Sequence, residues 1–298
     1  MNTTQFLPFE LLMIVLVSLC LRHAWKEGTQ NVLRLFAGIF FGVMLEWATI
    51  KQLDNYEYGT FFLMIDNIPL GIGMGWGVIL YSAMLFSDHC QIKEWARPVL
   101  DGLVALNIDL AMDAIAIRLG MWDWGDGLSY EYFGVPFENF WSWFWVIFSF
   151  SAAFRILNRL PEKISRYLAP LGSIPIGVFG VLASNRIISS YIPSDYDYLA
   201  ISLLIVCSLG LILSQKPKLK TAQMDSLVMW VPLGFHLYFI IVGIITRVIF
   251  TSWIIALISA AMFSASLYLH FPLVQSLWKK APVSERDHDQ ANIHTLRN

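Results

Sequence analysis

Charged residues are scarce in this sequence. Only 14% of the 298 residues are charged, whereas 57% are hydrophobic, and the mean hydropathy is +0.59. Soluble domains carry about 25% charged residues, so this composition is typical of an integral membrane protein. The net charge of −2 also lacks the basic excess that marks nucleic-acid-binding proteins. We therefore expect the lipid bilayer, and no nucleic acid, among the partners of this chain.

Cysteine and the common catalytic motifs are also rare or missing. The three cysteines lie far apart and form no C-x-x-C pair, so we expect neither a disulfide framework nor a cysteine metal site. No H-x-x-H, G-x-S-x-G or phosphate-loop pattern occurs, so zinc, acyl-serine and ATPase chemistry have no support. The first apolar run lacks a basic preceding segment and a small-residue cleavage site, and is expected to remain as a membrane span.

Nine apolar runs are long enough to cross a bilayer. A helix needs roughly 20 residues to cross the hydrocarbon core, and lipid offers no partner to an exposed backbone, so the spans must be helices. Only Thr246 and Arg247 separate the last two runs. The sequence predicts one all-α polytopic bundle over 1–270 and a short polar tail over 271–298. The runs lie near 6–22, 33–50, 68–86, 98–118, 136–156, 168–185, 198–214, 226–245 and 249–270.

Basic residues alternate between successive loops. Four loops and the tail hold 16 of the 20 Lys and Arg residues; they are 22–34, 87–97, 155–167, 215–225 and the chain from 271. The other loops are acidic and contain only Lys51, Arg118, Arg186 and Arg247. The positive-inside rule therefore places the N-terminus outside and the C-terminus in the cytoplasm, and we expect an inner (cytoplasmic) membrane.

Four of the carboxylates within the predicted spans matter for function, because an ionisable group there costs free energy and indicates a functional site unless a structural role explains it. Asp101 lies near the cytoplasmic end, where it can snorkel or cap a helix. Asp113 can pair with Arg118. Asp109 precedes Asp113 by four residues, so both share one helix face. Glu46 and Asp109 have no basic residue nearby in sequence, which predicts a lined cavity.

Aromatic and amide side chains gather beside these carboxylates. The loop after the fourth span and the start of the fifth contribute Trp122, Trp124, Tyr132, Asn139 and Trp143. Tryptophans at 141, 143 and 145 are also typical of an interfacial aromatic belt. His236, alone in the eighth span, is interpreted as a core histidine. The glycines at 71, 73, 75 and 77 fall inside a span and indicate close helix packing rather than a nucleotide loop.

A series of motifs extends from about residue 36 to residue 145. It comprises Gly42 with Leu45-Glu46, Tyr58-Gly59, Ile68-Pro69-Leu70, Trp76, Tyr81, Asp109-x-x-x-Asp113, Gly120-x-Trp122-x-Trp124, and Tyr132-x-Gly134-Val135-Pro136-x-x-Asn139-Phe140-x-x-Trp143. In order and spacing these residues resemble the carotenoid biosynthesis membrane family that contains the bacterial carotenoid hydratases. That family usually carries proline after the second aspartate, where this chain has Ala114, so the resemblance is to a divergent member.

The resemblance implies hydration of a terminal C=C bond in a lipid-soluble polyene, with no metal and no organic cofactor. Such chemistry needs a proton donor, a stabilised tertiary cation and activated water. A buried neutral carboxylic acid can donate the proton, aromatic faces can stabilise the cation by about 0.5–2 kcal/mol each, and a second carboxylate can hold the water. The expected catalytic residues are Glu46, Asp109 and Asp113. The expected substrate-binding residues are Trp122, Trp124, Tyr132, Asn139 and Trp143.

Two other functions remain open. Asn107-x-Asp109-x-x-x-Asp113 partly matches the aspartate-rich motif with which intramembrane prenyltransferases bind magnesium diphosphate, although a second motif and Lys/Arg clamps are missing. Buried acids also serve proton relays in transporters and could belong to a lipid carrier, although these acids gather near one face and no inverted repeat is visible. The sequence does not define the oligomeric state.

The orientation can be tested by cysteine labelling. Single cysteines placed in loops 51–67, 119–135 and 187–197 are expected to react with an impermeant thiol reagent added to intact cells, because these loops face outside. A cysteine in 215–225 is expected to stay unlabelled. Labelling of 215–225 from outside would contradict the nine-span arrangement.

Overall fold

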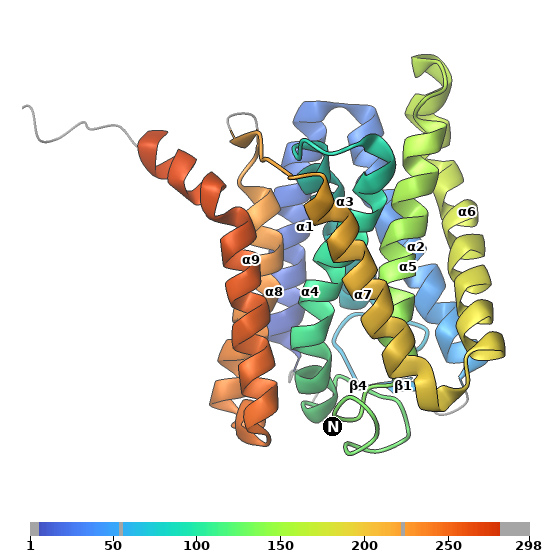
Figure 1. Ribbon diagram of the computed structural model, residues 1–298, viewed down its shortest axis with the longest axis vertical. Helices are drawn as coiled ribbons and strands as arrows, with labels where there is room; N and C mark the ends of the chain where they lie inside the picture. Colours follow the sequence, from blue (N-terminus) through green and yellow to red (C-terminus); the bar gives the residue numbers. More distant parts are fainter. Residues whose placement is uncertain (1–5, 54–55, 222–223, 281–298) are drawn as a thin grey trace, which may run out of the picture.

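The computed structural model describes residues 6–53, 56–221 and 224–280, and these residues form nine α-helices (Figure 1). The helices are α1 Leu7–Glu27, α2 Thr29–Gln52, α3 Leu70–Asp88, α4 Arg97–Arg118, α5 Phe137–Leu157, α6 Glu162–Tyr191, α7 Asp197–Ser214, α8 Leu227–Ile245 and α9 Trp253–Lys280. Each predicted span overlaps one helix, which confirms the all-α polytopic bundle. Asp54 and the part of the predicted tail from 281 lie outside the described residues.

Short elements join several of these helices. The described residues contain four strands, each two residues long. They form two antiparallel pairs: β1 (Glu57–Tyr58) with β4 (Trp122–Asp123), and β2 (Met64–Ile65) with β3 (Ile68–Pro69). The eighth and ninth predicted spans are separate helices, divided by a 3₁₀ turn at Val248–Phe250. Arg247 has a φ of 61° in the left-handed region, and this residue reverses the chain between them. Helix α9 continues ten residues beyond the predicted end of its span at 270.

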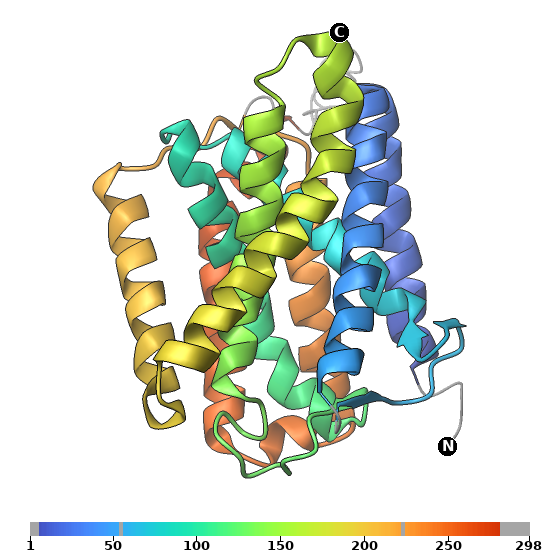
Figure 2. The same cartoon turned by 90° about the vertical axis from the view of Figure 1, so that its right-hand side faces the viewer.

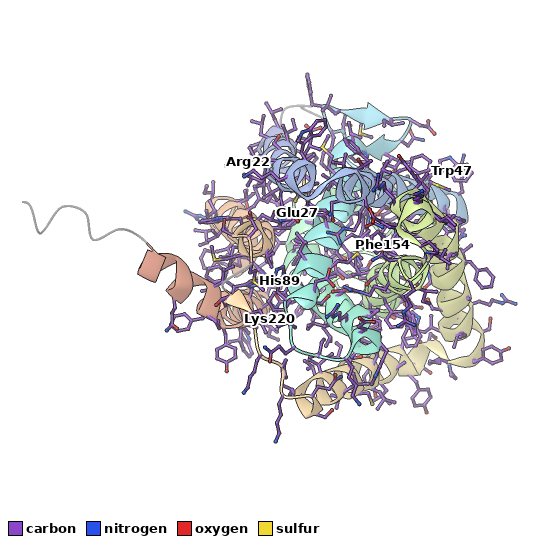
Figure 3. All side chains as sticks on the ribbon, turned by 90° about the horizontal axis from the view of Figure 1, so that it is seen from above. Arg22, Glu27, Trp47, His89, Phe154 and Lys220 are labelled. Carbon is purple, nitrogen blue, oxygen red and sulfur yellow. The ribbon has the colours of Figure 1, made fainter. Side chains whose placement is uncertain are left out.

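The centre of the bundle is formed by α3 and α4, which are buried along most of their length. The other helices surround them, as Figure 3 shows from one end of the bundle. In the described part of the chain, eight helices are long and apolar enough to cross a membrane. Helix α4 is not among them, because it carries three aspartates. The most polar span is therefore also one of the best shielded from lipid.

The loops divide between the two ends of the bundle as their charges predict. At one end, Gln91 N donates to Lys218 O at 2.9 Å and Lys220 N donates to His89 O at 2.9 Å, so two basic loops lie side by side. At the opposite end, β1 and β4 join the two acidic loops that precede α3 and follow α4 (Figure 1). The assignment of the basic end to the cytoplasm stays a prediction.

A buried ion network ties three helices together near the basic end. Arg155 of α5 contacts Asp88 of α3 at 2.5 Å and Asp101 of α4 at 3.3 Å, and Ser151 donates to Asp101 at 2.5 Å. Asp101 is fully buried. The interpretation of Asp101 as a snorkelling or capping residue is therefore wrong, because a buried carboxylate here has an arginine and a hydroxyl as partners. Removing one partner from such a network leaves an unpaired buried charge.

Prolines start two helices at the other end. Pro69 and Pro136 precede α3 and α5 with φ of −66° and −61° and ψ of 125° and 141°. This extended geometry suits the residue before a first turn, where proline's missing N–H is not needed. As a result, Trp76 lies two turns into α3 and Asn139 lies in the first turn of α5.

Close packing of α2 on α3 depends on glycine. A Cβ on Gly77 would lie 2.9 Å from the Ile39 backbone nitrogen, and one on Gly73 would overlap the Val43 side chain. Gly75 differs, because its added Cβ would lie at an ordinary 3.6 Å from Met13 Sδ and the Phe235 ring. The predicted close contact therefore involves the 73/77 pair, while Gly75 faces α1 and α8.

This difference gives a test of the packing. Gly77→Ala is expected to lower the free energy of unfolding by about 1–3 kcal/mol, because the new methyl group meets the Ile39 backbone as well as its side chain. Gly75→Ala is the matched control and is expected to fold normally. Thermal unfolding of the purified variants measures both, and equal stability would show that α2 and α3 do not meet at Gly77.

Candidate functional site

Two paired strands connect the loops at the acidic end of the bundle. Tyr58 of β1 lies opposite Trp122 of β4, and their ring centroids are 6.2 Å apart. Gly59 N donates to Met121 O at 3.0 Å, and a Cβ at Gly59 would overlap the Gly120 carbonyl oxygen. A glycine is thus required for the close approach of the two loops. The pairing places one aromatic donor above α2 and another above α4.

Glu46 is held on α2 by two of these donors. Tyr58 Oη donates to Glu46 Oε2 at 2.6 Å, and Trp76 Nε1 donates to Oε1 at 2.7 Å. Tyr56 Oη donates in turn to Tyr58 Oη at 2.9 Å. Burial raises the pKa of both loop tyrosines well above the usual range, so their hydroxyls stay protonated and remain donors. Both oxygens of this nearly buried carboxylate are therefore satisfied.

Asp109 and Asp113 lie one above the other on α4 and share a single amide. Asn139 Nδ2 donates to Asp113 Oδ2 at 2.7 Å and to Asp109 Oδ2 at 3.2 Å. Trp122 Nε1 adds a bond of 2.6 Å to Asp113 Oδ1. Asp109 is fully buried, and its Oδ1 has no hydrogen-bond partner among the described residues. The two aspartates are thus unequally supplied with donors.

The alternative partner of Asp113, Arg118, points elsewhere. Arg118 donates to the carbonyl oxygens of Ala114, Phe133 and Leu128 at 2.9, 2.6 and 3.1 Å. Within the described part of the chain it forms no ion pair with Asp113. Arg118 therefore holds the loop after α4 in place, and the described residues contain no ion pair to Glu46, Asp109 or Asp113.

A cavity of about 810 Å³ lies beside these groups. Its wall contains six of the eight residues expected at the site: Glu46, Asp113, Trp122, Trp124, Asn139 and Trp143. Asp109 is not on the wall and lies one helical turn deeper, behind Asp113. Tyr132 is also absent from the wall, because its hydroxyl donates to Leu110 O at 2.8 Å and its ring packs edge-on against Phe140.

Aromatic rings form much of the remaining wall. The Trp76 and Trp143 ring centroids are 4.2 Å apart, and those of Tyr56 and Trp124 are 4.5 Å apart. Trp143 therefore belongs to the cavity, whereas an aromatic belt would face the interface. The Trp124 indole nitrogen is buried and has no hydrogen-bond partner among the described residues. The site thus offers one free donor and several aromatic faces next to two carboxylates.

Three residues of the site were not expected from the sequence: Tyr56, Tyr58 and Trp76. The last two belong to the motif series, but nothing local indicates that they reach Glu46. His236 lies outside the cavity and bonds through Nε2 to Asn107 Oδ1 at 2.9 Å, as a core histidine would. In the described residues, no group of three or more His, Cys, Asp or Glu side chains is arranged to hold a metal ion.

The donor role of Tyr58 can be measured. Tyr58→Phe is expected to lower the free energy of unfolding by about 1–3 kcal/mol, because a buried oxygen of Glu46 loses its hydrogen-bond donor. In a Glu46→Gln background the same change is expected to cost less, which a double-mutant cycle detects. Tyr191→Phe, at an exposed position, is the control. An equal cost in both backgrounds would contradict the Tyr58–Glu46 bond.

Comparison with protein-family models matches residues 54–188 to the carotenoid biosynthesis protein family. The matched range extends from the loop before β1 to α6, and includes both aspartates and Asn139, while Glu46 precedes it. No curated protein and no solved structure matches the chain. The match confirms the resemblance that the motifs indicate and adds α6 to it. Residues 54–188 of this chain are thus similar to the carotenoid biosynthesis protein family.

Proposed function

We propose that this protein hydrates a terminal C=C bond of a carotenoid-type polyene by acid–base catalysis in the bacterial inner membrane. The observation that carries the proposal is the pair of carboxylates, Glu46 and Asp113, on the wall of one aromatic-lined cavity. A third carboxyl, Asp109, shares the Asn139 amide with Asp113. Acids that form no ion pair among the described residues, placed within an integral membrane protein similar to this family, suit proton transfer to a lipid-soluble substrate.

The two aspartates supply the proton in this proposal. Two carboxyl groups that share one site do not both ionise readily, so the pair holds one proton between its members. Asp109 cannot reach the cavity, whereas Asp113 can. Asp113 therefore transfers the proton to the less substituted alkene carbon, and Asp109 acts through Asp113 as a positioning residue. The π bond breaks, a C–H bond forms, and a tertiary cation remains.

Glu46 then activates the water. Tyr58 and Trp76 hold the Glu46 carboxyl group at the cavity wall, and their two hydrogen bonds favour its ionised form. Water attacks the cation as Glu46 accepts one of its protons, and that proton returns to the aspartate pair before the next turnover. One alkene and one water molecule thus give one tertiary alcohol. The faces of Trp122 and Trp143 stabilise the cation by about 0.5–2 kcal/mol each.

Isosteric variants test these roles. Asp113→Asn and Glu46→Gln keep the side-chain shape and remove the two groups that transfer protons, and Asp109→Asn removes the carboxyl that shares a proton with Asp113. Each variant is expected to lower the hydration rate of lycopene by about 10²–10⁴-fold. Asp123→Asn, on the exposed loop strand, is the control and is expected to keep its activity. Product mass measures the rate, and thermal unfolding shows that each variant is folded. Full activity of the Asp109→Asn protein would contradict the proposal.

A further inference from the structure

The lining of the cavity extends from the carboxylates onto two groups of helices, which we call its two arms. On one side its wall is formed by α2, α5 and α6, with Leu45, Val146, Val181 and Leu182. On the other side its wall is formed by α1, α3 and α8, with Phe9, Ile72, Gly75, Ile79 and Phe235. Figure 1 shows α1 and α8 on one side of α4, and α5 and α6 on the other. The reacting groups thus lie between two apolar arms.

The arm beside α1 and α8 is closed. Phe9, Ile79 and Phe235 are each 2% exposed, and the rings of Phe9 and Phe235 meet edge-on with centroids 6.4 Å apart. Gly75 lines this arm, and a Cβ there would first meet Met13 Sδ and the Phe235 ring, both at 3.6 Å. A chain that enters this arm has to end there.

The arm beside α6 is open to the side of the bundle. Helices α2 and α6 touch where a Cβ on Gly177 would lie 3.0 Å from the Phe41 ring. Beyond that contact they diverge toward the acidic end, as Figure 2 shows. Leu182 lines the cavity there and is 43% exposed. It lies nine residues before the end of α6, roughly 14 Å along the helix axis, which is the depth of hydrocarbon rather than of water.

We propose that a long linear hydrocarbon reaches the carboxylates from the bilayer through the opening between α2 and α6, and that its end stops in the closed arm beside Gly75. This inference rests on the proposed function. A pocket of this volume encloses a drug-sized molecule, and a carotenoid is considerably longer, so most of the chain must remain outside. The part of the hydrocarbon chain that remains outside the cavity leaves beside Leu182 and stays in lipid, so its apolar surface is not exposed to water.

Water reaches the cavity by a separate route. The rim of the cavity nearest the acidic loops is polar, with Gln52, Asp126, Glu138, Arg186 and Ser189. These side chains belong to helix ends and to the loop after α4, so they lie closer to the aqueous surface than Leu182. The hydrocarbon and the water molecule thus approach the carboxylates from different parts of the same opening, and the end of the chain does not cross the polar rim.

Photo-crosslinking tests the route without requiring turnover. A benzophenone amino acid replaces Leu182, or replaces Ile187 in the control, since Ile187 lies on the same helix, is 51% exposed and does not line the cavity. Each protein is placed in lipid nanodiscs containing lycopene and is irradiated. We expect lycopene adducts at position 182, at least about tenfold above position 187, where phospholipid is captured. Equal capture at both positions, or no lycopene adduct at 182, would overturn the route.

The closed arm is tested with a second pair of variants. Gly75→Val fills the arm and is expected to lower lycopene hydration by about tenfold or more, because overpacking displaces the chain end. Gly210→Val, on α7 with open space around it, is the control. Unchanged activity of a folded Gly75→Val protein would show that the chain end lies elsewhere. No lycopene adduct at position 182 in a protein that does hydrate lycopene would refute the route alone. A lycopene adduct at position 182 in a protein that forms no hydrated product would refute hydration alone.

Discussion

Carboxylates inside a membrane protein must receive their hydrogen bonds from side chains, and this requirement organises the acidic half of the bundle. On insertion scales an ionised group at the centre of a span costs about 2.5–3.5 kcal/mol. A hydrogen bond to a charged group contributes about 1.5–3 kcal/mol, so two donors offset one carboxylate. Glu46 has two donors and so does Asp113. Those donors come from β1, α3, β4 and α5, which fixes the relative positions of four elements.

The same helix shows two ways of keeping a buried aspartate. Near the basic end of α4, Asp101 is paired with Arg155, and the pair ties α3, α4 and α5 together. Near the acidic end, Asp109 and Asp113 share an amide and form no ion pair within the described part of the chain. A neutralised carboxylate stabilises structure and holds no exchangeable proton. An unneutralised pair can hold one proton between its members, and it is this pair that lies beside the cavity.

The fold could largely be predicted, because hydropathy and loop charge act on each span separately. The carboxylate spacing was also readable, since residues four apart share a helix face. The side chains that donate hydrogen bonds to these carboxylates could not be predicted from local sequence patterns. Tyr58 meets Glu46 only because β1 pairs with β4, and a two-residue strand leaves no alternation in the sequence. Tyr132 was expected on the cavity wall and turns to Leu110 instead, because its hydroxyl finds a backbone carbonyl of α4. Asp101 meets Arg155 across 54 residues, which no local pattern indicates.

The central claim is that the cavity adds water to a polyene. It is tested most directly by expressing the chain in a lycopene-producing bacterium grown in ¹⁸O-labelled water and measuring the masses of the pigments. The account predicts a pigment heavier than lycopene by one water molecule, with its oxygen taken from the labelled solvent, and none in cells that express the Asp109→Asn protein. Unchanged lycopene, or a product whose oxygen derives from O₂, would contradict it.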